Sequence, residues 1–359
     1  MDRANLASRR ADGQRIVLTL LLAWAAAQVC VWLRTPIPWM LGPLLATGAA
    51  SALRQPTRSA APLRNFGQWA IGAALGLYFT PQISTLVVKL WWAVMLGVLW
   101  ALVLGCGFSV WLHRAHSHRF GGNARQNRST SYYAGAIGGA SEMAMLAERD
   151  GARTDLVVAA HSMRLLIVTI VLPFAFTFSD LHGVDTMPPG VREVRWDGLA
   201  LLAAATLAGV AVLRMAGRTN PWFMGALVVS MALTMAGLPL SAMPSWVSSA
   251  AQLFIGVSLG VRFRPEFVHT APRWLVTVAL GTLVMIVLSA GFAWWLAWVT
   301  GLHVATLMLG TAPGGIAEMA ITAKVLQLGV PVVTAFQVCR LVAVLVLAGP
   351  LFRLLSRRL

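Results

Sequence analysis

Charged residues are scarce in this chain. They make up 11% of its 359 residues, and only 12 residues are acidic. An ordinary soluble domain carries about 25% charged residues. Hydrophobic residues make up 58% of the chain, and several apolar runs reach the ~20 residues that a helix needs to cross a bilayer core. The composition therefore excludes a typical soluble domain and predicts an all-α polytopic membrane protein.

Cysteine is also scarce, and no group of residues has the spacing of a metal site. The three cysteines lie in apolar segments at unrelated spacings, as expected for packed thiols. They are Cys30, Cys106 and Cys339. His113, His116 and His118 stand close together, but in a basic connector without nearby carboxylates or thiols, so a solvated loop is the simpler interpretation. We expect no metal, no cofactor and no enzyme activity.

The net charge of +16 comes from arginines in short connectors rather than from a basic domain. No zinc-finger spacing or recognition helix accompanies them, which argues against a nucleic-acid partner. The basic connectors are 54–64, 113–128, 214–218 and 262–273, whereas 80–85, 237–245 and 300–303 carry no lysine or arginine. Cytoplasmic connectors of membrane proteins are rich in both residues. The pattern therefore predicts cytoplasmic N- and C-termini.

Ten apolar segments are predicted to cross the membrane, five in each half. They are 15–33, 38–53, 66–80, 86–112 and 155–178, then 196–213, 221–237, 246–261, 273–299 and 331–352. Because five is an odd number, the two halves face opposite ways. Segments 131–150 and 304–327 are left as re-entrant hairpins or broken helices. The predicted parts are a cytoplasmic tail (1–14), membrane repeat 1 (15–178), a periplasmic linker (179–195), membrane repeat 2 (196–352) and a cytoplasmic tail (353–359).

A glycine-rich block occurs twice in the chain. Gly138-Gly139-Ala140-Ser141-Glu142-Met143-Ala144 is matched by Gly314-Gly315-Ile316-Ala317-Glu318-Met319-Ala320, and an arginine follows each glutamate by 22 residues (Arg164 and Arg340). Two further blocks recur in the same order, at Pro38-Trp39 and Pro221-Trp222 and around Gln68 and Gln252. Matching short, Gly- and Pro-interrupted segments in two halves indicate the binding site of a secondary transporter. We therefore expect two inverted repeats that arose by duplication.

The glutamates and arginines of these blocks are the sharpest candidates for function. Each charged side chain inside a bilayer costs about 2.5–3.5 kcal/mol on insertion scales. Glu142 and Glu318 could carry a proton or bind a cation, and Arg164 and Arg340 could clamp a carboxylate or phosphate. The alternative is that each glutamate is only the structural partner of the arginine on the next helix. The remaining residues of the predicted site are Gly138, Gly139, Ser141, Gly314, Gly315, Gln68 and Gln252.

Four other polar residues are open to two interpretations. Gln68 and Gln252 could contact a solute, although hydrogen bonding between helices is the simpler role. Lys324 has no lysine counterpart in the first repeat, and it could act in function or reach the membrane surface by snorkelling. His161 lies three residues before Arg164, on the same helix face. It is either a proton relay or a packed polar side chain.

The duplicated Pro-Trp and Gly-Gly-x-x-Glu-Met-Ala blocks resemble those of the AbrB family, bacterial multi-pass inner-membrane proteins with two copies of an AbrB duplication unit. The resemblance covers roughly residues 15–355. The family is distinct from the small soluble DNA-binding regulators of the same name. Its members are commonly labelled regulators of gene expression or ammonia monooxygenases. The resemblance implies an inner-membrane location and supplies no catalytic residues.

These observations predict a secondary transporter of a small, anionic solute that works by alternating access, coupled to H+ or Na+. Its site would lie where the two glycine blocks approach each other near the middle of the membrane. The alternative is a membrane-embedded sensor that regulates gene expression indirectly, without transport. A monooxygenase would need converging metal ligands, which the sequence does not offer. Besides the solute and the lipid bilayer, the expected partner is a second copy of the chain.

Overall fold

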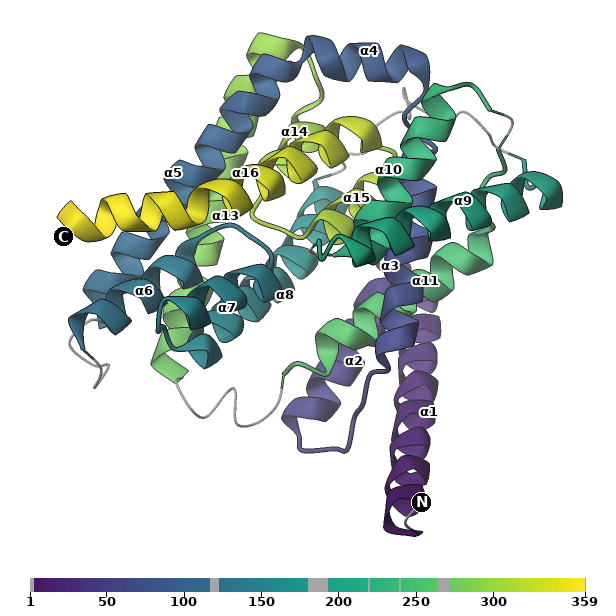
Figure 1. Cartoon of the computed structure of the whole chain (residues 1–359), viewed down its shortest axis with the longest axis horizontal. Coiled ribbons are helices and arrows are strands. Elements are labelled where there is room, and N and C mark those ends of the chain that lie inside the picture. Colours follow the sequence, from purple (N-terminus) through teal and green to yellow (C-terminus); the bar gives the residue numbers. More distant parts are fainter. Residues whose placement is uncertain are drawn as a thin grey trace. The chain divides into compact units, whose positions relative to one another are not determined.

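The structure is a computed structural model that describes residues 3–116, 123–179, 193–218, 220–238, 240–263 and 272–358. Within these ranges the chain forms fifteen helices and no strand, in agreement with the predicted all-α class (Figure 1). The side chains of residues 3–11, 141 and 355–358 are outside the description. Ser141, one of the predicted site residues, is therefore placed only by its backbone.

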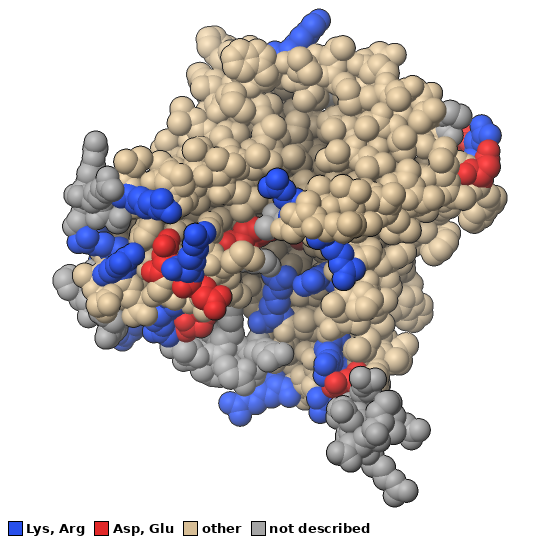
Figure 2. Space-filling view, in the orientation of Figure 1, with Lys and Arg blue, Asp and Glu red and all other residues tan. Residues whose placement is uncertain are grey.

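Six helices are long and apolar enough to cross a membrane. They are α1 (Arg3–Trp32, apolar from Asp12), α5 (Trp91–His116), α8 (Thr154–Phe178), α9 (Trp196–Met215), α13 (Pro272–Thr300) and α16 (Val330–Arg358, apolar to Leu354). Most of the face seen in Figure 2 consists of uncharged residues, with the charged side chains in small separate groups. A chain with this many apolar helices is a multi-pass membrane protein.

The other predicted spans correspond to shorter helices. These are α2 (Pro38–Ala52), α3 (Ala61–Gly76), α10 (Pro221–Met235) and α11 (Ser245–Gly260), each of 15 or 16 residues. A short helix that the sequence did not predict, α4 (Pro81–Lys89), follows α3 at an angle of 89°. The structure thus places a sharp bend where a connector, 80–85, was expected.

The two glycine-rich blocks interrupt helices, as predicted. The first pair is α6 (Ala124–Gly135) and α7 (Ala140–Arg149), and the second is α14 (Val304–Thr311) and α15 (Ile316–Val325). Each break is four residues long, and a glycine of the block is the N-cap residue of the helix that follows. The prediction of half-helices broken near each double glycine is confirmed.

The chain divides into two compact units, and each unit takes helices from both predicted repeats. Unit 1 consists of Met1–Thr85 with Met187–His269, and unit 2 of Leu86–Thr186 with Thr270–Leu359. Unit 1 therefore holds α1–α3 with α9–α11, whereas unit 2 holds α5–α8 with α13–α16. Both broken helix pairs belong to unit 2.

Close backbone contacts within unit 1 join helices of the two predicted repeats. Gly72 of α3 lies against the carbonyl oxygen of Phe223 on α10, and Gly256 of α11 lies against that of Met40 on α2. A Cβ at either glycine would clash with that oxygen. Small residues allow this close approach of helix backbones. Gly72 and Gly256 therefore serve the close packing of neighbouring helices.

Both predicted tails are largely helical. α1 begins at Arg3, inside the segment 1–14, and α16 continues through 353–358. Most of the predicted linker 179–195 lies outside the described residues, as do His118 and Arg119 of the basic connector. α9 begins at Trp196, the first residue of predicted repeat 2.

Candidate functional site

Arg340 on α16 holds the carboxyl end of α14. Its guanidinium donates hydrogen bonds to the carbonyl oxygens of Ala312 and Gly314, both at 2.6 Å. One helical turn earlier, the Gln337 amide donates to the carbonyl of Leu309 at 2.6 Å. The last carbonyls of a helix have no partner inside that helix, and they carry partial negative charge that a cation stabilises. Arg340 and Gln337 thus satisfy the backbone groups that the break exposes.

Arg164 on α8 plays the same part for α6. Its guanidinium donates to the carbonyls of Ala136 at 3.0 Å and Ala134 at 3.5 Å, and it lies 2.7 Å from His161 Nδ1. Because arginine can only donate, His161 Nδ1 must accept this bond. The imidazole is then neutral, and its Nε2–H donates to the Tyr133 carbonyl at 2.9 Å. This geometry favours the packed, positioning role for His161 over a proton relay.

A third contact closes each broken pair at its other end. The backbone N–H of Arg153 donates to Thr130 Oγ1 at 3.0 Å, and that of Gly329 donates to Thr306 Oγ1 at 3.2 Å. Thr130 and Thr306 are buried. Each threonine therefore ties the chain that leaves the second half-helix back to the first half-helix.

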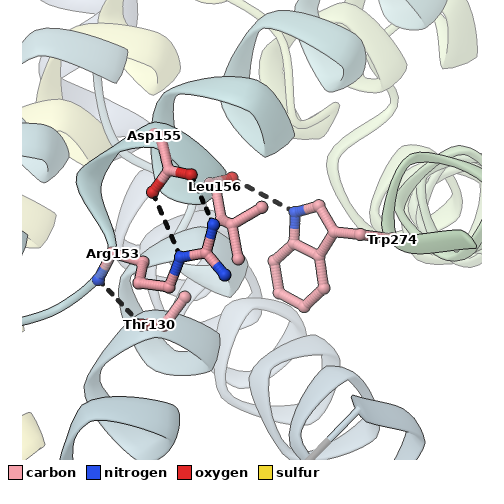
Figure 3. Close-up of polar contacts among 5 residues, drawn as sticks. All are labelled: Thr130, Arg153, Asp155, Leu156 and Trp274. Carbon is pink, nitrogen blue, oxygen red and sulfur yellow. Dashed lines mark hydrogen bonds and ion pairs between the residues drawn. The ribbon is translucent and has the colours of Figure 1, made fainter. Parts of the chain in front are cut away.

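Figure 3 shows the surroundings of the first of these ties. The Arg153 side chain forms an ion pair with Asp155, at 2.7 Å, in the first turn of α8. The neighbouring Leu156 carbonyl accepts a hydrogen bond from Trp274 Nε1 of α13 at 3.2 Å. The turn between α7 and α8 is thus fixed to both α6 and α13.

Most contacts of the two broken pairs correspond at one constant offset. The exception is the second carbonyl that each arginine holds, which is that of Ala134 in the first pair and that of Gly314 in the second. Adding 176 to a residue number of the first pair gives its counterpart in the second. Tyr133, His161 and Arg164 thus correspond to Leu309, Gln337 and Arg340. The same offset relates the two threonine ties. It also relates Gly138, which lies against Met143, to Gly314, which lies against Met319. The similarity of the two sequence blocks therefore extends to their side-chain contacts.

The two glutamates do not pair with the two arginines. Glu142 and Glu318 are each in the first turn of their helix, and each carboxylate lies back over the N-cap glycine, Gly139 or Gly315. A Cβ on either glycine would clash with the carboxylate Oε2. Among the described residues, neither Arg164 nor Arg340 forms an ion pair. The structural partners of the arginines are backbone carbonyls instead.

Positive charge is concentrated at the two breaks. Arg164 is 3% exposed and Arg340 is 5% exposed, so one guanidinium group is buried at each break. Arg340 Nε and Gln337 Oε1 are buried without a hydrogen-bond partner. A positive N-terminal helix end, that of α7 or α15, adds to the field at each break. Such an arrangement can attract and hold an anion.

The predicted site residues are divided between the two units. Both glycine blocks and both arginines lie in unit 2, whereas Gln68 on α3 and Gln252 on α11 belong to unit 1. Lys324 is partly buried near the end of α15. Within the described residues, no three His, Cys, Asp or Glu side chains are grouped so that they could hold a metal ion.

Sequence reasoning missed Gln337 and the two threonines of the ties. Gln337 could have been found by adding the offset of 176 residues to His161. Thr130 and Thr306 are related by the same offset, but the glycine block that defined the repeat lies downstream of both.

Comparisons with known proteins show the family to which the chain belongs. The sequence model of the family described as transition state regulatory protein AbrB matches residues 39–356. An uncharacterized protein named YhjN from Bacillus subtilis (strain 168) is 26% identical over 350 residues, which cover 89% of this chain and 87% of that protein. A candidate regulator named AbrB from Escherichia coli (strain K12) is 26% identical over 348 residues, 94% of each chain. On the family match, which spans most of its length, the chain belongs to the AbrB family.

Proposed function

We propose that this protein is a secondary transporter of a small anionic solute, working by alternating access in the bacterial inner membrane. One observation carries the proposal. Two buried guanidinium groups lie at two helix breaks, and neither forms an ion pair with a carboxylate among the described residues. A buried charged side chain inside a membrane protein is costly and marks a substrate or ion pathway.

The broken helices support the same function. Irregular backbone at membrane depth is tolerated where it is buried in protein or lines a water-filled cavity. Transporters place their solutes at such breaks, where half-helix N-termini face anionic groups. Here the N-cap of α15 directly follows the Gly314 carbonyl that Arg340 holds, and α7 begins four residues after the Ala136 carbonyl that Arg164 holds.

The arginines act mainly by their charge in this proposal. Each guanidinium already donates to two carbonyls, so it cannot turn fully toward a solute without exposing the helix end. It has five N–H donors, and Arg340 Nε has no partner. The solute would therefore be held by backbone amides and the remaining donors, within the field of both arginines.

The shared offset of the two sets of contacts supports two repeats. Together with the arginine-rich connectors, it supports the proposal that the repeats are inverted and that both termini are cytoplasmic.

The test begins by comparing the metabolites retained by cells with and without the protein. Anions that differ are then supplied to proteoliposomes that contain the purified chain. Uptake of an anion that depends on the protein is the expected result. Arg340→Lys keeps the charge and should retain uptake, whereas Arg340→Gln keeps hydrogen-bond donors without the charge and should lose most of it. Equal uptake by these two variants would overturn the role of charge.

The name of one relative favours a second candidate function. The Escherichia coli protein is named as a candidate regulator, and a sensor that changes gene expression without transport would keep the same membrane fold. Its partner would dock on the basic connector 113–128 or on the C-terminal tail. Replacing residues 117–122 by a Gly-Ser segment of equal length leaves α5 and α6 intact. Altered transcript levels with unchanged uptake would support the sensor, and unaltered transcripts would argue against it.

A further inference from the structure

Glu318 occupies the end of α15 that should attract an anion. It is the third residue after the N-cap position of Gly315, and its side chain lies back over that glycine. The side chain is 7% exposed. A glutamate at this position of a helix commonly reaches back to the N-terminal amides, where negative charge is stabilised. The protein's own carboxylate is thus placed where a solute anion would bind.

Unused polar atoms lie beside the same helix end. Arg340 donates to Gly314, the residue just before the N-cap of α15, while its Nε has no partner. Gln337 points its amide nitrogen at the same stretch of backbone, and its Oε1 has no partner. Both residues are buried. Buried polar atoms of a native protein are normally hydrogen-bonded, so the free Nε–H of Arg340 indicates a ligand that can accept its hydrogen bond.

We propose that the N-terminal end of α15 is a single anion-binding site, called the seat below, which the Glu318 carboxylate and the transported anion occupy in turn. The anion then enters when Glu318 takes up a proton, so the protein moves a small monovalent anion together with one H+. This inference rests on the proposed transport function and names its coupling ion. One proton and one monovalent anion carry no net charge, so the exchange in the seat is electroneutral.

The reason for the coupling is repulsion between like charges. Two negative charges at one helix end interact strongly when the surroundings have a low dielectric constant. One carboxylate of such a pair is therefore driven to its neutral form. A protonated Glu318 no longer competes for the amides or for the field of Arg340.

The charged and titratable groups around Glu318 come from α15 itself and from the helices packed against it. α15 packs against α8, α14 and α16. α14 carries no charged residue. Within ten residues of the two arginines along the chain, the charged or titratable groups are Asp155, His161 and Arg164 on α8 and Cys339 and Arg340 on α16. α15 itself also carries Lys324. His161 is held neutral by Arg164, and Asp155 is paired with Arg153.

Glu142 provides a matched comparison. It has the same place over Gly139 at the start of α7, but it is only half-buried. A carboxylate with more access to solvent interacts less strongly with a neighbouring charge. We therefore assign the coupling to Glu318 and expect Glu142 to contribute little.

The test measures anion binding to the purified full-length protein in lipid nanodiscs. The probe is methanesulfonate, which stays fully ionised between about pH 5 and pH 8, so that any proton taken up belongs to the protein. Calorimetry in buffers of different ionisation enthalpy gives the affinity and the number of protons taken up. For the wild type we expect affinity to rise up to tenfold for each unit of falling pH, with uptake of about one proton.

Three variants make this test decisive. In Glu318→Gln, binding should persist without pH dependence or proton uptake, whereas Glu142→Gln should keep both the pH dependence and the proton uptake, whatever its affinity. Gly315→Ala adds a Cβ that pushes the Glu318 carboxylate out of the seat and should also weaken the pH dependence. Gly291→Ala, where a Cβ meets nothing within 4 Å, is its control.

The outcomes separate this inference from the proposed function. Binding to the wild type that does not depend on pH, or pH dependence that survives in Glu318→Gln, overturns the shared seat and leaves transport standing. Loss of all binding in Glu318→Gln also overturns it, because the carboxylate would then be a ligand rather than a competitor. If the wild type binds no methanesulfonate at any pH and its proteoliposomes take up no metabolite anion, both proposals fail.

Discussion

The Arg340 guanidinium lies 2.6 Å from the carbonyl oxygen of Ala312, the C-cap residue of α14. The buried guanidinium thus donates the hydrogen bond that a backbone N–H would have donated if α14 had continued for a further turn. In the first broken pair, Arg164 makes the same contact with the C-cap residue Ala136. The two arginines therefore cap the broken helix ends by hydrogen bonding. Their positive charge remains available to attract an anion to the site.

This capping role predicts how substitutions of Arg340 affect stability. Arg340→Ala removes two hydrogen bonds from a charged donor to buried carbonyls, so we expect the free energy of unfolding to fall by about 2–4 kcal/mol. Arg340→Lys keeps one strong donor and should cost less than half of that. Unfolding of the purified protein in detergent measures both. An alanine variant as stable as the wild type would contradict the capping role.

The equivalence of His161 and Gln337 gives a prediction for α8. His161→Gln should place an amide where the second broken pair already has one, so it should change stability by less than about 1 kcal/mol and leave uptake intact. His161→Leu leaves the Tyr133 carbonyl without its partner and should cost about 1–3 kcal/mol. Thermal unfolding and uptake are measured side by side. Loss of proton coupling in His161→Gln would instead favour the relay.

Close backbone contacts in unit 1 predict a contrast among glycines. Gly72→Ala and Gly256→Ala each force a Cβ against a carbonyl oxygen of the neighbouring helix, and overpacking of this kind costs about 1–3 kcal/mol. Gly107 and Gly291 are helical, and a Cβ there meets nothing within 4 Å. Alanine at either position should be neutral or stabilise by up to about 1 kcal/mol. Equal effects at all four glycines in detergent unfolding would contradict the close packing.

Much of this fold follows from the pattern of apolar residues. The boundaries of the long helices come close to the predicted spans because a bilayer fixes their length. The breaks could be placed because Gly138-Gly139 and Gly314-Gly315 interrupt otherwise apolar segments. α4 (Pro81–Lys89) was missed because residues 81–85 were taken as a connector and residues 86–89 as the start of the span 86–112, whereas α5 begins only at Trp91.

The partners of charged residues could not be predicted in the same way. Sequence shows that Glu318 and Arg340 recur at a fixed spacing, and opposite charges at that spacing suggest an ion pair. In the structure Arg340 turns instead to carbonyls that are unpaired only because α14 stops at Thr311. Backbone groups of this kind carry no sequence signal. The mixing of both repeats within each unit depends on packing between distant helices, which a single sequence does not reveal.

The proposed inversion of the repeats predicts where two exposed positions can be labelled. Arg149 ends α7 and Gln327 follows α15, and both are exposed at the same end of their broken pairs. If the first pair enters from the cytoplasm and the second from the periplasm, Arg149→Cys and Gln327→Cys should react with a membrane-impermeant maleimide from opposite sides.

The native cysteines Cys30, Cys106 and Cys339 are first replaced by serine, and the cysteine-free chain serves as the control in intact cells and inverted vesicles. Labelling of both positions from one side would place the two breaks in the same orientation. Because parallel half-helices direct their positive ends the same way, the two N-termini could not then converge on a site between them. Labelling from opposite sides supports two N-termini that approach one anion from the two leaflets.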